Sequence, residues 1–255
     1  MAYINAISYY LPGEVLTNET LHSMFPDWSV DKIAAKTGIQ RRYIASEEES
    51  SSTMAIEAAR LLFETHAVSP ADIDFILLCT QSPDYVLPTT ACMVQSALHI
   101  PTTAGALDFN LGCSGYVYGL GLAKGLLLTN DVKNVLLITS ETYSKYLGAD
   151  DKSVRTIFGD AASATLISSK PSALAARIGH LSYGTDGTGA QHLIVKKQSA
   201  LFMNGPEIFS FTLKRVPEMI QETLDRNNAR LEEVDLFIFH QANKYMLDHL
   251  MKKLN

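Results

Sequence analysis

Short apolar runs alternate with segments of helical periodicity along most of the chain. Nearly continuous apolar runs of this length predict buried strands, and they lie at 73–79, 104–110, 135–139 and 164–168. Helical spacing predicts helices between them, at 52–66, 89–98 and 114–129. Hydroxyl residues at 51–53 followed by Glu57 predict the capped start of the first helix. Strands without polar alternation are typical of a parallel or mixed sheet covered on both faces by helices, so the fold class is α/β.

Two stretches resemble one another within the chain. Residues 71–81 (ADIDFILLCTQ) follow the first predicted helix, and residues 232–241 (EEVDLFIFHQ) follow a helical run at 211–227. The predicted strand ends, Cys79 and His240, then fall in register. This repeat indicates a duplicated α/β unit, although helix–loop–strand units are common enough for coincidence to remain an alternative.

Under the duplication, the second copy is incomplete. Only residues 242–255 follow the second predicted strand, far fewer than follow the first. Because unpaired strand edges are unfavourable, we expect the chain to be a fragment that lacks about 70 C-terminal residues of the second copy. The expected domains are residues 1–170, which carry Cys113, and residues 171–255, which carry His240.

Composition narrows the class of protein. A hydrophobic share of 47% over 255 residues is ordinary for a globular chain. The net charge of −6, from 21 basic and 27 acidic residues without a basic block, excludes nucleic acid or an anionic membrane as the main partner. The most apolar stretch, 111–128, contains Lys124 and several glycines, which favours a buried helix over a membrane span. An odd number of cysteines and no signal-like start predict a cytoplasmic chain with reduced thiols.

Cys113 is the first candidate for chemistry. It lies in the segment 110–115 (NLGCSG), between a predicted strand and a predicted helix. The positive end of the helix dipole is expected to lower the pKa of a thiol in this place and to raise its thiolate fraction, as a nucleophile needs. Cys79 and Cys92 fall inside a strand and a helix and are interpreted as small buried apolar residues.

His240 is the second candidate. It closes the predicted strand 236–239 and precedes a predicted helix at 244–254. Functional groups of α/β proteins gather at the carboxyl ends of strands, whereas a surface or capping histidine is the plainer alternative. No cysteine or histidine has the spacing of a zinc finger or of the HExxH motif, so no metal site is expected.

Five segments together resemble one known family. They are residues 37–42 (TGIQRR), the Cys113 segment, 157–160 (IFGD), 203–209 (MNGPEIF) and 240–243 (HQAN). Their order and spacing are similar to those of β-ketoacyl-acyl carrier protein synthase III, a thiolase-like condensing enzyme. The resemblance implies a duplicated thiolase-like α/β unit with mixed sheets, a homodimer, and the initiation of fatty acid synthesis, hence lipid metabolism.

The resemblance also implies a mechanism. Cys113 takes an acyl primer from a thioester, and the acyl-Cys is then attacked by the enolate formed when malonyl-acyl carrier protein loses CO₂. His240 stabilises that enolate together with an asparagine that the family carries about 30 residues further on. Neither this asparagine nor the family's second oxyanion loop occurs before Asn255, so we expect these 255 residues to be inactive in condensation.

The resemblance implies an acyl-CoA or acyl-carrier-protein thioester as substrate and implies no cofactor. Several positions differ from the family in ways that affect the expected substrate. Lys32 stands where many members place a tryptophan against the adenine of CoA, and Lys152 replaces an arginine. With Lys36, these lysines are expected to meet phosphates. Leu87 and Phe209 are assigned to the acyl-substrate site, and Leu87, where some members carry phenylalanine, predicts room for a primer larger than acetyl.

An acidic acyl carrier protein needs a basic docking patch. The family's docking segment maps to Gln241, Ala242, Asn243, Lys244 and Tyr245, with Lys252 and Lys253 one to two turns on, and Lys214 and Arg215 are possible additions. Four alternatives stay open: an acyltransferase, a polyketide-type synthase of the same fold, a non-catalytic partner subunit and a cysteine hydrolase.

Overall fold

A computed structural model describes residues 1–197 and 199–254 of the chain. The chain forms two compact units that interleave along the sequence. The first unit comprises Met1–Glu14, Tyr43–Thr142 and Asp160–Gly179, and the second comprises Val15–Arg42, Tyr143–Gly159 and His180–Asn255. The expected domain boundary at residue 170 stays a prediction. No helix among the described residues is both long and apolar enough to cross a membrane.

The first unit is built on a six-stranded mixed sheet in the order β5-β4-β6-β7-β1-β8. The strands are β1 (Tyr3–Tyr10), β4 (Phe75–Cys79), β5 (Gly105–Phe109), β6 (Asn134–Glu141), β7 (Ala161–Ser168) and β8 (Ala176–Arg177). Strand β4 runs parallel to both β5 and β6, and the other neighbouring pairs are antiparallel. Each of the four predicted strands is confirmed to within a few residues, and so is the α/β class.

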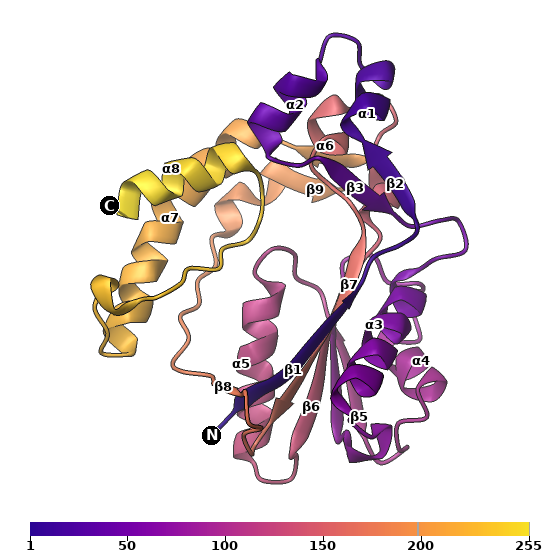
Figure 1. Ribbon diagram of the computed structural model, residues 1–255, viewed down its shortest axis with the longest axis vertical. Coiled ribbons are helices and arrows are strands. Elements are labelled where there is room, and N and C mark those ends of the chain that lie inside the picture. Colours follow the sequence, from indigo (N-terminus) through magenta and orange to yellow (C-terminus); the bar gives the residue numbers. More distant parts are fainter. Residues whose placement is uncertain (198, 255) are drawn as a thin grey trace. The chain divides into compact units, whose positions relative to one another are not determined.

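Helices cover both faces of this sheet, as predicted (Figure 1). Helices α3 (Ser51–His66) and α4 (Thr90–Ala97) lie on one face, and α5 (Gly115–Leu128) lies on the other. The main core lies under α3, where Met54 and Leu62 pack with Ile76 and Leu136 at zero exposure. This burial explains why the central strands carry no polar alternation.

Helix α3 begins one residue earlier than predicted. Ser50 is its N-cap, and its hydroxyl accepts a hydrogen bond from the backbone N–H of Thr53. The Thr53 hydroxyl in turn accepts from the Ser50 N–H, so Thr53 takes the part in the capping box that the sequence assigned to Glu57. Glu57 instead forms an exposed ion pair with Arg60 on the surface of the helix.

The second unit consists mainly of helices. They are α1 (Asn18–Met24), α2 (Val30–Thr37), α6 (Lys152–Arg155), α7 (Gly205–Arg226) and α8 (Lys244–Leu254), with 3₁₀ turns at Tyr143–Tyr146, Gly187–His192 and Leu231–Glu233. Strands β9 (Leu193–Val195) and β10 (Leu201–Met203) form a two-stranded sheet, and β2 (Glu14–Thr17) pairs with β3 (Arg41–Ile44). The predicted helices at 211–227 and 244–254 are confirmed.

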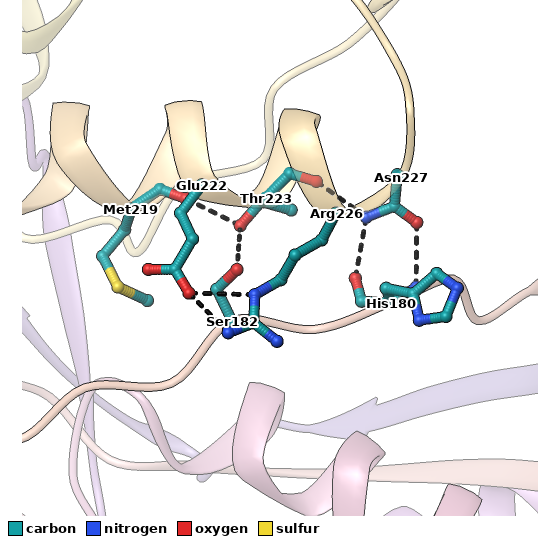
Figure 2. A network of polar contacts seen from close by, with 7 residues as sticks. All are labelled: His180, Ser182, Met219, Glu222, Thr223, Arg226 and Asn227. Carbon is teal, nitrogen blue, oxygen red and sulfur yellow. Dashed lines mark hydrogen bonds and ion pairs between the residues drawn. The ribbon is translucent and has the colours of Figure 1, made fainter.

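A short extended segment is fastened along α7 by a polar network (Figure 2). The Asn227 side chain accepts from the backbone N–H of His180 and donates to the carbonyl oxygen of the same residue, at 2.8 and 2.9 Å. One turn earlier the Thr223 hydroxyl donates to the Ser182 hydroxyl at 3.1 Å. The two Asn227 bonds satisfy the backbone of His180, and the Thr223 bond holds the Ser182 side chain, in a segment that belongs to no helix or strand.

The predicted strand at 236–239 does not form. The 3₁₀ turn at Leu231–Glu233 repeats the turn at Pro70–Asp72 that precedes β4, so the internal repeat holds up to this point. Residues 236–239 then run as irregular chain, with Leu236 and Ile238 at 72% and 85% exposure. A strand needs a neighbour to exchange hydrogen bonds with, and no strand within 1–197 and 199–254 pairs with this segment.

Candidate active site

Cys113 lies in the turn that joins β5 to α5. The strand ends at Phe109 and the helix begins at Gly115, so the thiol precedes the first helical residue by two positions. The backbone N–H of Gly115 donates to the carbonyl oxygen of Gly112 at 2.8 Å and closes the turn. Cys113 is exposed and Cys79 is buried as predicted, whereas Cys92 is only half-buried. The exposed thiol in a tight strand-to-helix turn is the placement expected of a nucleophile.

Residues at and just after the end of β4 donate hydrogen bonds to this turn. The Cys79 thiol donates to the carbonyl oxygen of Leu111 at 3.1 Å, and the Gln81 amide donates to the Asn110 side-chain oxygen at 2.8 Å. A Cβ atom on Gly115 would lie 2.3 Å from the Cys79 sulfur. Glycine at position 115 therefore allows the helix to start directly against the buried thiol.

The pKa of Cys113 differs from the expectation. Although the Cys113 side chain reaches the surface, the groups packed around its sulfur desolvate the thiol and raise its pKa above the ordinary value. The Glu141 carboxylate raises the pKa further, and a hydrogen bond from the residue's own backbone N–H opposes both effects. The expected lowering by the helix dipole is therefore wrong in net direction, because desolvation and a nearby negative charge outweigh the favourable backbone. The resting nucleophile is a thiol that must lose its proton to react.

Glu141 is a titratable group that sequence reasoning missed. It ends β6, and its carboxylate accepts from the backbone N–H of Gln81 and from the Ser82 hydroxyl, both at 2.8 Å. Burial raises the pKa of Glu141 to about 7, with Asp160 adding to the rise and the bonds from Ser82 and Gln81 opposing it. In the sequence, Glu141 is only a glutamate after Ser140, just past a predicted strand end, and nothing there indicates that its carboxylate is buried.

His240 lies in the second unit and is the first residue of the 240–243 segment, which ends where α8 begins at Lys244. The His240 side chain is exposed, but partial desolvation lowers the pKa of its imidazole below the ordinary value, which favours the neutral ring. Two residues of the segment organise the helix start: the Asn243 side chain accepts from the Met246 N–H at 2.8 Å, and the Ala242 N–H donates to the His240 carbonyl oxygen. Asn243, assigned to carrier docking, is therefore also the cap of α8.

Three lysines singled out in the sequence surround one indole. Lys32 and Lys36 of α2 and Lys152 of α6 place their ammonium groups 5.4, 5.5 and 5.8 Å from the centre of the Trp28 ring. These distances are within the range of cation–π attraction. Position 32 is a lysine, but an indole is supplied by position 28, which the sequence alone did not indicate.

The residues assigned to the acyl site and to docking are distributed over both units. Leu87 is 80% exposed in the first unit, in the exposed stretch Tyr85–Leu87. In the second unit the ring centres of Phe209 and Tyr245 lie 5.3 Å apart in a tilted arrangement, and both rings contact His249. Phe209 and Tyr245, assigned separate roles from the sequence, are therefore neighbours between α7 and α8.

The basic docking residues differ in their partners. Lys244 forms an ion pair with Asp248 at 2.6 Å, and the Lys253 ammonium donates to the Leu213 carbonyl oxygen at 2.9 Å. Arg215 faces Glu218 and Asp186. Lys252 is exposed, and within residues 1–197 and 199–254 it makes neither a hydrogen bond nor an ion pair. In that described part, no group of three acidic, cysteine or histidine side chains could hold a metal ion.

Comparison with known proteins identifies the family. Residues 107–187, which include Cys113 and Glu141, match the model of 3-oxoacyl-[acyl-carrier-protein] synthase III. A β-ketoacyl-[acyl-carrier-protein] synthase III of Clostridium perfringens is 35% identical over 96% of this chain and 78% of its own length. The chain belongs to the β-ketoacyl-acyl carrier protein synthase III family. Solved structures agree with this membership.

A crystal structure of a synthase III superimposes with a TM-score of 0.95 at 49% identity, covering 99% of this chain and 82% of its own. The synthase III of Aquifex aeolicus superimposes with a TM-score of 0.93 at 32% identity, covering 100% and 81% of the two chains. The thiolase-like fold predicted from the sequence motifs is confirmed. Membership of the synthase III family favours a condensing acyltransferase over the other activities left open by the sequence.

Proposed function

We propose that this chain uses Cys113 to accept an acyl primer and passes it to the enolate of malonyl-acyl carrier protein, the reaction that initiates fatty acid synthesis. Membership of the synthase III family, with an exposed cysteine in the turn before α5, carries the proposal. In the first half-reaction the Cys113 sulfur bonds to the primer carbonyl carbon, and the carrier thiol leaves with a proton. In the second, malonyl loses CO₂, its α-carbon attacks the acyl-Cys113 carbonyl, and the Cys113 thiolate leaves.

His240 and a backbone amide complete the proposed chemistry. The lowered pKa of His240 favours a neutral imidazole, whose remaining N–H is proposed to donate a hydrogen bond to the enolate oxygen. The backbone N–H of Cys113, which already favours negative charge at its own sulfur, is proposed as an oxyanion donor. No cofactor or metal is required by this sequence of steps.

The primer and the partners are further parts of the proposal. The lysines around Trp28 supply positive charge for the phosphates of an acyl-CoA or of a carrier-protein arm, and Leu87 contributes to an acyl site that admits primers larger than acetyl. A homodimer is supported by the exposed stretch Tyr85–Leu87 and by the exposed Leu107 on the edge strand β5. We propose a cytoplasmic location, together with docking of the acidic carrier protein on 241–245, Lys252 and Lys253.

Acylation of Cys113 is the decisive test. The chain is incubated with a panel of acyl-CoA and acyl-carrier-protein thioesters, and the mass of the Cys113 peptide is measured. We expect one acyl group on Cys113 and none in the C113A variant, with branched or longer primers accepted at least as well as acetyl. No acylation by any thioester would support a non-catalytic subunit, and strong preference for acetyl would remove the role proposed for Leu87.

A second measurement separates condensation from acyl transfer. Release of CO₂ from malonyl-carrier protein by the acylated enzyme marks a condensing enzyme, and H240A is expected to lower it while leaving acylation of Cys113 intact. These 255 residues are themselves expected to acylate Cys113 but to release little CO₂, so H240A is compared with this low residual release. Near-native release by the unsubstituted chain would contradict the expectation. Hydrolysis of the acyl-Cys113 without malonyl carrier would point to a thioesterase.

A further inference from the structure

A continuous set of contacts links a buried carboxylate to the nucleophile's turn. The Glu141 side chain fixes the 81–82 segment by accepting from the Gln81 N–H and the Ser82 hydroxyl at 2.8 Å each. Ser82 is held in addition by the Thr142 N–H and by Ser51, at 2.9 Å each. The position of this segment is therefore determined by strand β6 and helix α3 together.

From this segment one side chain reaches the turn. The Gln81 amide donates to the Asn110 side-chain oxygen at 2.8 Å, where the chain leaves β5 for Cys113. The proposed catalytic steps involve Cys113 and His240 and give no role to the Gln81–Asn110 hydrogen bond. Gln81 is held at its backbone N–H by Glu141 and holds Asn110 through its side-chain amide, so it is suited to limiting motion of the turn. The bond to this turn from the Cys79 thiol is a weak one.

We propose that Glu141 is a positioning residue for the nucleophile: through Gln81 and Asn110 its carboxylate fixes the turn from which the Cys113 thiol projects. The inference deepens the proposed function and rests on it only in taking Cys113 as the group that is acylated. The proposed role of Glu141 needs no contact with the substrate or with the Cys113 sulfur. Glu141 acts through the Gln81–Asn110 contact and through its negative charge.

The charge makes the role measurable. Glu141 raises the pKa of Cys113 and also that of Cys79, and Asp160 is the acidic group that raises the pKa of Glu141 itself. Removing the carboxylate charge should therefore favour the Cys113 thiolate. Breaking the Gln81–Asn110 contact removes no charge, so it should alter the position of the turn without altering the ionisation of the thiol.

The experiment uses the whole chain and five variants. E141Q removes the charge, Q81A and N110A remove the contact, and E57Q is a matched control that neutralises an exposed glutamate of α3. Two readouts are taken: the rate of iodoacetamide labelling of the Cys113 peptide between about pH 6 and 10, and the rate of Cys113 acylation by an acyl-CoA. Q221A, on the exposed face of α7, is the control for the glutamine substitution.

We expect the labelling profile of E141Q to shift to lower pH while that of E57Q stays at the wild-type position. Q81A and N110A should keep the wild-type profile but acylate at least ~10-fold more slowly, because small displacements of a reacting atom are costly. Q221A should match wild type. An unshifted profile in E141Q, or wild-type acylation rates in Q81A and N110A, would overturn the proposal.

Failure of the proposed function and failure of the role proposed for Glu141 give different results. If wild-type Cys113 is acylated by no thioester, the proposed function fails, and the labelling profile of E141Q still decides whether Glu141 acts on this thiol. If E141Q does not fold, shown by its circular dichroism, Q81A and N110A decide, because both side chains lie at the surface.

Discussion

At the scale of single residues, the turn that carries Cys113 depends on the absence of a side chain at Gly115. Gly115 starts α5 where any larger side chain would meet the Cys79 sulfur, and Cys79 in turn holds the Leu111 carbonyl. The two residues are 36 positions apart in the sequence but are matched in size. This pairing explains a glycine at a helix start that conformational freedom alone does not require.

The G115A variant should therefore be destabilised. An added methyl group 2.3 Å from the Cys79 sulfur forces either side chain to move, and overpacking of this kind costs about 1–3 kcal/mol. The free energy of unfolding from urea denaturation checks this. The C79A/G115A double variant should recover most of the loss, since alanine at position 79 removes the sulfur. Additive losses in the double variant would show that the clash is not the cause.

Glu141 should make stability depend on pH. Its pKa is about 7 in the folded chain against an ordinary 4.5, so between these values the folded state binds more protons than the unfolded state. The free energy of unfolding is therefore expected to fall as pH rises from about 5 to 7 in wild type, relative to E141Q. Urea titrations of both proteins across this range test the sign. Parallel profiles would show that Glu141 is not protonated on folding.

At the scale of elements, carboxylates from loops and strands hold the helix starts in the first unit. Asp84 accepts from the Ser50 and Ser52 hydroxyls at 2.7 and 2.6 Å and from the Ser52 N–H at 2.9 Å, at the start of α3. Asp108 of β5 accepts from the Thr90 and Ala91 N–H groups at the start of α4. A negative charge at each helix N-terminus is favourable, and it also fixes where each helix begins.

Substitution of Asp84 should loosen the start of α3. D84A leaves two hydroxyls and a backbone N–H without their acceptor, and hydrogen bonds to a charged group are worth about 1–3 kcal/mol. We expect a lower free energy of unfolding for D84A and a smaller loss for D84N, which keeps one acceptor oxygen. D131A, at an exposed position, serves as the control. Equal stability of D84A and D131A would contradict the assignment of Asp84 as an anchor of α3.

At the scale of the whole molecule, an acidic chain must present positive charge locally to bind an acidic partner. With a net charge of −6 the chain repels such a partner at long range. Of the proposed docking lysines, Lys244 is already paired with Asp248, whereas Lys252 carries an uncompensated charge in the described part of the chain. The two lysines on α8 should therefore contribute unequally.

Charge reversal at Lys252 should weaken carrier binding more than reversal at Lys244. K252E removes an attraction and adds a repulsion, while the Lys244 charge is partly cancelled before substitution. Surface charges of this kind act mainly on the association rate and are screened by salt. We expect several-fold weaker binding of acyl carrier protein to K252E at low ionic strength, measured by titration, and convergence of the variants at high salt. Equal effects of K252E and K244E would locate docking elsewhere.

The sequence by itself determined the parts that depend on local pattern. The four buried strands and the helices that alternate with them follow from apolar periodicity, because burial on both faces leaves the same signal in every such strand. The motif around Cys113 and its relation to the 240–243 segment were enough to indicate the synthase III family. Each strand, helix and motif is carried by residues close together in the chain, and the family is indicated by the order and spacing of those short motifs.

The tertiary structure decided what depends on distant neighbours. The pKa of Cys113 is raised, not lowered, because the groups packed around the thiol desolvate it and Glu141 of another strand adds a negative charge. The lysines meet around Trp28 because α6 lies against the same indole as α2. Residues 236–239 have the composition of a strand but no partner strand among the described residues. Ionisation, capping and pairing are properties of the groups that surround a residue, and a linear pattern does not specify those groups.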